Sequence, residues 1–278
     1  MTPQPLAAKS MLIKCQNLSL GYDGKAVVSS LDFTVEHGDY LWVVGENGSG
    51  KTTLIRGILR LINPLEGSIL FCNELRQGRI GYLSQQMALK KDFPAGVLEI
   101  VLSGNLGGMG LRPFYSAKEK NLALEAMEQL GIAGLRGKCF RELSGGQQRR
   151  VLLARALCAA QTSSPASAHA SAQAVAQAAP ASSGAEHNKS CRLLILDEPA
   201  ASLDPLVTSE VYGLLETLNK AMGITIIMVS HDIRSAEQYS NRVLHLEKGR
   251  ACFYESAEYL RSEKSGKFFA GLRNNGNG

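Results

Sequence analysis

The sequence lacks the features that would connect it directly to a membrane, to nucleic acid or to a disulfide framework. No apolar run approaches the roughly 18 residues that a membrane-spanning helix needs, so we expect any membrane role to depend on a partner. The net charge of +5 is mild and spread over 278 residues, and we therefore expect no nucleic-acid partner. The six cysteines are far apart, without a C-x-x-C pair or a signal peptide, and are expected to be free thiols in a reducing cytoplasm.

Residues 45–52 form the most informative segment, because they fit the pattern G-x-x-x-x-G-K-[ST] at every fixed position. The apolar, β-prone run 40–44 precedes them, and residues 53–59 have helical spacing. A strand, a glycine-rich loop and a helix in this order are what phosphate binding at a helix N-terminus requires. The pattern predicts that Lys51 reaches the β- and γ-phosphates of a nucleotide and that the Thr52 hydroxyl binds Mg²⁺.

Hydrophobic periodicity predicts an α/β fold with a mainly parallel sheet. A β-α-β pattern around a phosphate loop indicates that the ligand binds at the C-terminal ends of the strands. Residues 88–142 are broken into short pieces by glycine and proline, which indicates a helical insert. Strands are expected at 11–20, 27–35, 40–44, 68–73, 79–83, 192–196 and 224–229, and helices at 53–59, 118–130, 151–157 and 206–222.

Residues 161–190 have a different composition from the rest of the chain. Alanine or serine occupies 17 of these 30 positions, so the segment offers too little large apolar surface to offset the entropy of ordering. We predict a disordered, low-complexity insertion, and interpret His169 and His187 within it as incidental. The loop-closure cost of such an insertion grows slowly with its length, so the fold is expected to tolerate it.

Two further segments carry candidate chemistry. Asp197 and Glu198 end an apolar run, where the first carboxylate could bind Mg²⁺ and the second could orient or deprotonate a water molecule. Taken alone, such a pair could equally be a capping device. Residues 143–147 read LSGGQ and precede an apolar helix, which predicts an anion site at the helix N-terminus together with an N-cap at Ser144.

In this order, the phosphate loop, LSGGQ and the Asp-Glu pair resemble the ATP-binding subunits of ATP-binding cassette (ABC) transporters. The resemblance implies a single domain over residues 1–278, built as a P-loop NTPase of the ABC ATPase type. Its parallel core would carry an antiparallel β subdomain and a helical subdomain at about 88–155. It also implies ATP hydrolysis with Mg²⁺.

The resemblance assigns a role to each motif residue. ATP would be bound by Tyr22, which stacks on adenine, and by Gly45, Glu46, Asn47, Gly48, Ser49, Gly50, Lys51, Thr52 and Thr53. Catalysis would rest on Glu198, His231 and Gln85, and Mg²⁺ on Thr52, Gln85 and Asp197. Leu143, Ser144, Gly145, Gly146 and Gln147 would bind the ATP of a second subunit, and Ser202, Leu203 and Asp204 would form the D-loop.

The resemblance also implies partners and a location. Two copies would sandwich ATP and act on integral-membrane permease subunits at the cytoplasmic side of the cell membrane, serving an extracytoplasmic substrate-binding protein indirectly. Residues 92–104, 112–115 and 139–144 resemble importers of zinc and manganese most, which predicts an importer of a divalent metal ion. No His, Cys and carboxylate cluster with ligand spacing is present, so the metal is not expected to bind this chain.

Three alternatives remain at this point. Importers of iron chelates use a similar subunit, and an exporter ATPase would pair with spanning segments of another type. A soluble ABC ATPase of DNA repair or translation usually has a coiled-coil insertion or two cassettes, whereas this sequence has one cassette and no heptad run. Co-purification with a multi-spanning protein would separate transport from the soluble class.

Overall fold

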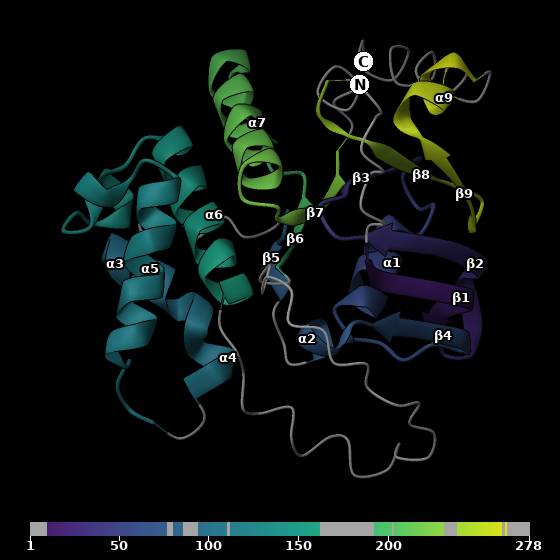
Figure 1. Cartoon of the computed structure of the whole chain (residues 1–278), viewed down its shortest axis with the longest axis horizontal. Coiled ribbons are helices and arrows are strands. Elements are labelled where there is room, and N and C mark those ends of the chain that lie inside the picture. The colour runs from purple at the N-terminus through teal and green to yellow at the C-terminus, as the bar shows by residue number, and fades with distance from the viewer. Residues whose placement is uncertain are drawn as a thin grey trace, which may run out of the picture. The chain divides into compact units, whose positions relative to one another are not determined.

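The computed structural model describes residues 10–76, 80–85, 94–109, 112–161, 192–201, 203–230, 238–262 and 265. The chain divides into two compact units, which are described separately. Unit 1 comprises Met1–Cys72 and Ile224–Gly278, and unit 2 comprises Asn73–Gly223. The colour scale of Figure 1 therefore shows unit 1 at its purple and yellow ends and unit 2 mainly in teal and green.

The first sheet of unit 1 is antiparallel, with the strand order β2-β1-β4. Its strands are β1 (Met11–Tyr22), β2 (Lys25–Glu36) and β4 (Glu66–Phe71). Asp23 and Gly24, between β1 and β2, have φ values of 49° and 74°. Two consecutive left-handed residues give a hairpin turn whose twist matches that of the flanking strands. The strands expected at 11–20 and 27–35 therefore form an antiparallel hairpin.

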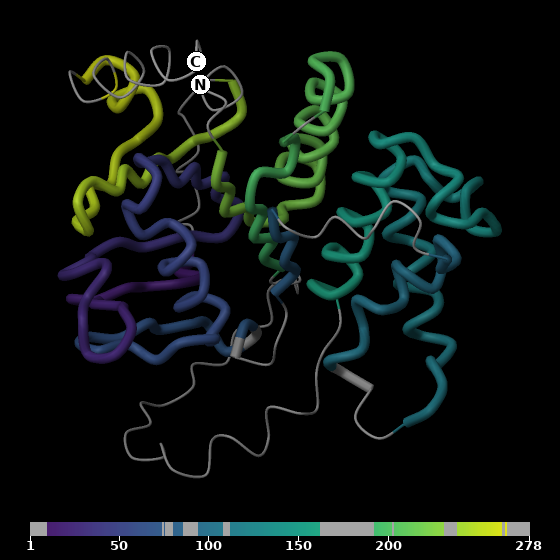
Figure 2. Tube along the Cα trace, turned by 180° about the vertical axis from the view of Figure 1, so that it is seen from behind, coloured from purple at the N-terminus to yellow at the C-terminus, as the bar shows by residue number. Residues whose placement is uncertain are grey.

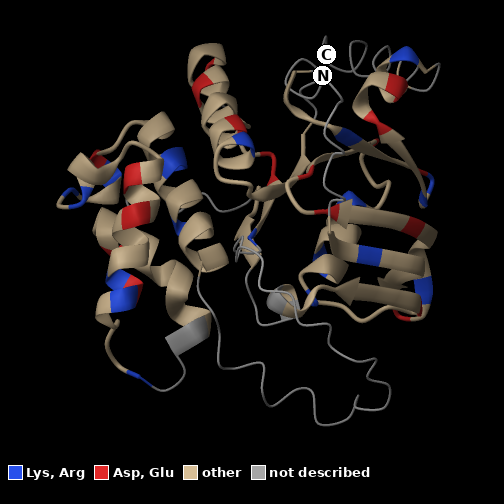
Figure 3. Ribbon diagram, viewed as in Figure 1, with Lys and Arg blue, Asp and Glu red and all other residues tan. Residues whose placement is uncertain are grey.

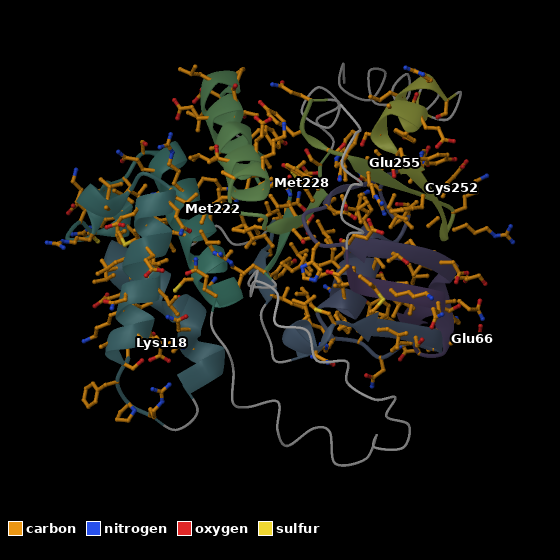
Figure 4. All side chains as sticks on the ribbon, in the orientation of Figure 1. Glu66, Lys118, Met222, Met228, Cys252 and Glu255 are labelled. Carbon is orange, nitrogen blue, oxygen red and sulfur yellow. The ribbon has the colours of Figure 1, made fainter. Side chains whose placement is uncertain are left out.

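The core of unit 1 is built around β3 (Tyr40–Gly45), which lies parallel between β7 (Thr225–Val229) and β8 (Arg242–Glu247). Every residue of β3 and β7 is buried, as expected for strands covered on both faces. Met228 of β7, labelled in Figure 4, accepts a hydrogen bond from the Tyr40 hydroxyl at 3.6 Å. The remaining elements are α1 (Lys51–Ile58), β9 (Arg250–Glu255), which is antiparallel to β8, and α9 (Ser256–Arg261).

Unit 2 contains the parallel strands β5 (Ile80–Leu83) and β6 (Leu193–Asp197), and α6 (Gly145–Gln161) packs against β5. Gly81 permits this packing, because a Cβ atom there would lie 2.1 Å from the backbone oxygen of Ala156. The other helices are α2 (Asn73–Arg76), α3 (Val97–Leu102), α4 (Leu106–Met109), α5 (Ala117–Gln129) and α7 (Pro205–Lys220). Short 3₁₀ turns occur at Ser103–Asn105, Ala133–Leu135 and Phe140–Glu142.

A buried polar contact connects the 3₁₀ turn Ser103–Asn105 to α5 and α6 in unit 2. The Asn105 side-chain amide donates to the Glu119 backbone oxygen at 3.3 Å, and its Oδ1 accepts from the Cys158 thiol at 3.4 Å. Burial raises the pKa of Cys158 to about 11, which keeps the thiol protonated as a donor at neutral pH. In both views of the chain, α3, α5 and α6 lie side by side (Figures 1 and 2).

The predicted strands and helices of the described residues are confirmed, with ends shifted by a few residues. The sequence did not specify α2, α3, α4, β8, β9 or α9. The predicted insertion at 161–190 lies outside the described residues except for Gln161, the last residue of α6. Among the described residues, no helix is both long and apolar enough to cross a membrane. Figure 3 shows Lys and Arg residues interspersed with Asp and Glu residues along the described ribbon of each unit.

Candidate functional site

The phosphate loop of unit 1 connects the end of β3 to the start of α1. Gly45, Gly48 and Gly50 all have positive φ, at 152°, 81° and 105°. Two of them are also enclosed by neighbours, because a Cβ atom on Gly45 would lie 2.3 Å from the Leu246 backbone oxygen and one on Gly50 would lie 2.2 Å from Val28. Side chains are therefore excluded both by backbone conformation and by close approach.

The side chain of Lys51 crosses this loop. Its Nζ donates to the backbone oxygens of Gly45 at 2.7 Å and of Glu46 at 2.9 Å. The ammonium is thereby held at the N-terminal end of α1, where the helix dipole is positive. A lysine in this place, together with the N–H groups of the first helical turn, forms a site that favours an anion.

The buried hydroxyl of Ser49 gives a second indication of a ligand. Ser49 is 6% exposed, and its Oγ has no hydrogen-bond partner among the described residues. A buried, unsatisfied polar group costs free energy unless a ligand or water completes it. Thr52 is exposed and Thr53 is buried at the start of α1, so the Thr52 hydroxyl is the more accessible of the two.

Tyr22 lies at the end of β1 and is 40% exposed. Its hydroxyl accepts a hydrogen bond from Nη1 of Arg56 on α1 at 2.8 Å. This contact with Arg56 lowers the pKa of Tyr22. The ring is thus connected to the helix that follows the phosphate loop, which fixes the hydroxyl while leaving part of the aromatic face accessible.

The C-terminal end of β7 lies at the same sheet edge as the phosphate loop. Val43 of β3 pairs with Val229 of β7, so the segments that follow these two strands leave the sheet at neighbouring positions. The indole Nε1 of Trp42 donates to the Ser230 backbone oxygen at 2.8 Å and anchors the chain there. His231 is the next residue and lies outside the described residues.

The end of β6 in unit 2 carries the predicted carboxylates. Asp197, at its last position, is 8% exposed, and Glu198 follows with a left-handed φ of 51°. Leu83 of β5 pairs with Leu196, so Gln85 leaves the parallel strands at the same edge. The structure therefore brings Gln85 and the two carboxylates of unit 2 to a common edge.

Arg149 of α6 contacts the backbone immediately after β6, a contact that sequence reasoning missed. Its Nη2 donates to the Glu198 oxygen and its Nε to the Pro199 oxygen. Burial lowers the pKa of Arg149, and the nearby charges of Glu198, Tyr212 and Asp197 oppose this shift. The sequence contains no signal for the contact, because 49 residues separate Arg149 from Glu198.

The LSGGQ segment forms an exposed, self-capped helix start. The Ser144 hydroxyl accepts from the Gln147 backbone N–H at 3.3 Å, and the Gln147 side chain accepts from the Ser144 N–H at 3.1 Å. This reciprocal capping box confirms the predicted N-cap at Ser144. Leu143 is buried, whereas Ser144 and Gly145 are exposed at the surface of unit 2.

The predicted D-loop precedes α7. Asp204 caps this helix, since its Oδ1 accepts from the Val207 N–H at 3.0 Å, and Pro205 occupies the first helical turn. Leu203 is half-buried and its N–H bonds the Ala200 oxygen at 3.3 Å. Ser202 lies outside the described residues.

Comparisons with known proteins agree with these motifs. The family model described as ABC transporter matches residues 28–162. A probable metal transport system ATP-binding protein of Chlamydia muridarum is 32% identical over 242 residues, covering 86% of this chain and 89% of the relative. The chain belongs to the ATP-binding proteins of ABC transporters. Members of this family hydrolyse ATP, and the chain is an ATPase of the ABC type.

Two further comparisons cover most of the cassette. The zinc transport system ATP-binding protein TroB of Treponema pallidum is 30% identical over 284 residues, covering 98% of this chain and 94% of TroB. The solved cassette MJ0796, described as a dimer bound to ADP and Pi after hydrolysis, is 23% identical with a TM-score of 0.63. It covers 88% of this chain and 99% of its own, and at this identity it shows the fold alone.

Proposed function

We propose that this ABC ATPase powers uptake of a divalent metal ion, zinc or manganese, through a partner membrane permease. The phosphate loop supports the ATPase part of this proposal. Its glycine backbone and the Lys51 ammonium offer an anion site at the start of α1. The metal cargo follows from the relatives, which are named for metal and zinc transport.

In the proposed site, residues 45–53 bind the triphosphate through backbone N–H groups. Lys51 exchanges its bonds to the Gly45 and Glu46 oxygens for bonds to the β- and γ-phosphates. The unsatisfied Ser49 hydroxyl gains a partner at the same time. Tyr22 offers the exposed part of its ring to adenine, while Arg56 holds its hydroxyl.

The proposed Mg²⁺ ligands suit this ion by their chemistry. Thr52 offers an exposed hydroxyl, Asp197 a carboxylate at the end of a parallel strand, and Gln85 an amide oxygen. These are hard oxygen donors, which Mg²⁺ prefers to nitrogen or sulfur. When bound, the ion neutralises charge on the β- and γ-phosphate oxygens.

Glu198 is the proposed general base for the attacking water. It follows the buried strand β6 directly, so its backbone is tied to a rigid element. Gln85 and His231 are proposed to contact the water or the γ-phosphate. Accepting a proton from the attacking water is a task for a carboxylate, and such general-base catalysis contributes about 10²–10⁴-fold to a rate.

The second half of each site is proposed to come from another copy of the chain. Ser144 and Gly145 are exposed at a helix N-terminus, so they are accessible to an anion held by a partner. Residues 143–147 would thus close over the ATP of a second subunit, with Ser202, Leu203 and Asp204 beside them. The solved cassette MJ0796, which shares the fold, is described as a dimer.

The proposed assembly lies at the cytoplasmic side of the cell membrane. There the ATP-driven approach and separation of two copies would be transmitted to integral-membrane permease subunits. An extracytoplasmic substrate-binding protein would deliver the metal to the permease and thus act on this chain only indirectly. The proposed function involves no nucleic-acid partner.

Glu198→Gln tests the catalytic part of the proposal. The amide cannot accept the proton, so hydrolysis is expected to fall by about 10²–10⁴-fold while ATP binding is kept. The variant should also accumulate as an ATP-bound dimer in size-exclusion chromatography with light scattering. Glu216→Gln is the matched control, because Glu216 is on α7 and pairs with Lys220 across one helical turn. Normal hydrolysis by Glu198→Gln would contradict the assignment of the base.

ATPase measurements in reconstituted vesicles test which substrate the transporter carries. The chain is assembled with the permease and substrate-binding protein that co-purify with it, and ATPase activity is measured with zinc, manganese and iron chelates. Stimulation by zinc or manganese supports the proposal. Stimulation by an iron chelate alone would assign the subunit to a chelate importer, and purification without any membrane protein would favour a soluble ABC ATPase.

A further inference from the structure

The contact of Arg149 with residues 198–199 connects the helix after LSGGQ to the proposed base. Nη2 and Nε of one guanidinium donate to two consecutive backbone oxygens, those of Glu198 and Pro199. Two parallel bonds from a planar group fix orientation as well as position. Because both peptide oxygens are held, rotation of the 198–199 and 199–200 peptide planes is restricted.

We propose that Arg149 is a positioning residue that holds the backbone of Glu198 in the conformation needed to activate water. This inference rests on the proposed role of Glu198 as general base. Arg149 itself contacts neither the water nor the phosphates in this proposal. Its effect on hydrolysis is exerted through Glu198.

The backbone conformation of Glu198 explains why such a support is needed. Its φ of 51° is in the left-handed region, which residues with a side chain rarely adopt. A conformation of this kind persists when surrounding contacts over-determine it. The N–H of Ala201 also bonds the Glu198 oxygen, at 3.2 Å, so this oxygen accepts from both the following turn and Arg149.

The location of Arg149 gives the contact a second consequence. Arg149 is the fifth residue of α6, and α6 begins directly after Ser144 of the capping box. A helix is stiff over this distance, so a displacement of the LSGGQ segment also moves the guanidinium. The proposed base is therefore mechanically connected to the segment that would meet the ATP of the partner.

The adjacent Arg150 provides a matched comparison on the same helix. Its Nη2 pairs with Glu210 of α7 at 2.5 Å, and Glu210 is 47% exposed in its side chain. Arg150 thus connects α6 to α7 without contacting residues 198–199 in any described contact. Removing either arginine deletes one positive charge from α6 together with its described contacts. Of the two arginines, Arg149 is the one that bonds the Glu198 backbone in the described contacts.

The experiment compares Arg149→Ala, Arg149→Lys and Arg150→Ala in the full chain, with kcat and KM for ATP and the melting temperature. Arg149→Ala is expected to lower kcat by about tenfold or more, with KM changed by less than about threefold, because misplacing a catalytic group by 1 Å can cost 10²-fold. Arg149→Lys should restore only part of kcat, because one ammonium does not reproduce the planar fork. Arg150→Ala should retain kcat within about twofold of the original chain.

The same substitution in the Glu198→Gln background separates positioning from folding. Single-turnover hydrolysis by Glu198→Gln and by the double variant with Arg149→Ala should agree within about twofold, since the base is already lost. A further tenfold loss in the double variant would overturn the inference. So would an unchanged kcat in Arg149→Ala, or a loss of kcat that Arg150→Ala reproduces with the same fall in melting temperature.

The two proposals fail in different ways. If Glu198→Gln is inactive and Arg149→Ala is fully active, the proposed function remains and the positioning role is wrong. If Glu198→Gln hydrolyses ATP at the normal rate, both the base assignment and the inference are wrong.

Discussion

The phosphate loop of unit 1 and the LSGGQ segment of unit 2 are both glycine-rich starts of helices, yet they are stabilised differently. Neighbouring strands enclose the phosphate loop, since Cβ atoms on Gly45 and Gly50 would meet Leu246 of β8 and Val28 of β2. The LSGGQ start is exposed and is closed by its own Ser144–Gln147 capping box. One conformation is therefore imposed by tertiary packing, and the other by local hydrogen bonds.

This difference indicates how each segment can contribute to an ATP site. An enclosed loop with a built-in ammonium can bind phosphate within one subunit. An exposed helix end can instead meet an anion that another molecule presents. Substitutions in the first should act on nucleotide binding by the chain itself, and those in the second on events that need two copies.

Among the substitutions that test this comparison, Lys51→Ala has the largest expected effect. Loss of the ammonium removes the charge that is held between the Gly45 and Glu46 oxygens. ATP affinity should fall at least about tenfold and hydrolysis on the order of 10²-fold, because charge-assisted bonds to phosphate are the strongest in such a site. Isothermal titration calorimetry and a phosphate-release assay measure the two effects.

Lys220→Ala is the control for this substitution. Lys220 pairs with Glu216 on the surface of α7, and exposed pairs of this kind contribute little to stability. Its variant should bind and hydrolyse ATP normally. ATP binding by Lys51→Ala that equals that of the control would remove the phosphate loop from the proposed site.

Substitutions of the two glycines of LSGGQ distinguish effects on packing from effects on function. A Cβ atom on Gly146 would lie 2.8 Å from Val207 of α7, whereas one on Gly145 would come no closer than 4.0 Å to Leu203. Gly146→Ala is expected to lower the free energy of unfolding by about 1–3 kcal/mol through overpacking, and Gly145→Ala to leave it nearly unchanged. Urea unfolding followed by circular dichroism measures both.

ATP-dependent dimerisation and the free energy of unfolding should respond differently to Gly145→Ala. If LSGGQ meets the ATP of a partner, Gly145→Ala should weaken ATP-dependent dimerisation in the Glu198→Gln background despite normal stability. Nucleotide binding to the monomer should stay unchanged. A Gly145→Ala protein that dimerises as well as its parent would show that this glycine does not form part of the interface.

Asp204→Ala has the smallest expected effect and tests the role of local caps in unit 2. The substitution removes the acceptor for the Val207 N–H, a bond of 3.0 Å, and should lower the free energy of unfolding by about 1 kcal/mol. Asp204→Asn should keep most of the cap, because asparagine caps helices about as well as aspartate. Equal unfolding midpoints for all three proteins would contradict a capping role.

Much of the fold could be predicted from sequence because its signals are local. Continuous apolar runs predicted the buried strands β3, β6 and β7, and helical spacing with the Asp204–Pro205 start agrees with α7. The roles of Tyr22, Gln85 and Glu198 in ATP chemistry remain predictions. Only the Ser144 cap, which depends on residues three positions apart, is directly confirmed by its hydrogen bonds.

Contacts between distant residues could not be predicted in the same way. Nothing in the local sequence indicates that Arg149 bonds the backbone at residues 198–199, or that Gly146 is crowded by Val207 while Gly145 is not. Gly145 and Gly146 are adjacent in the sequence, so an α-helix places them about 100° apart around its axis. Which of them faces α7 depends on how α6 packs within unit 2.

The amino-acid sequence by itself determined the strands β1 to β7, the helices α1, α5, α6 and α7, the phosphate-loop pattern and the helix cap at Ser144. Each of these depends on residues that are close along the chain. The tertiary structure alone decided which glycines cannot carry a side chain and which of two adjacent arginines holds the turn after β6. Those outcomes depend on close packing between segments that are far apart in the sequence, where a few tenths of an ångström decide whether an atom fits.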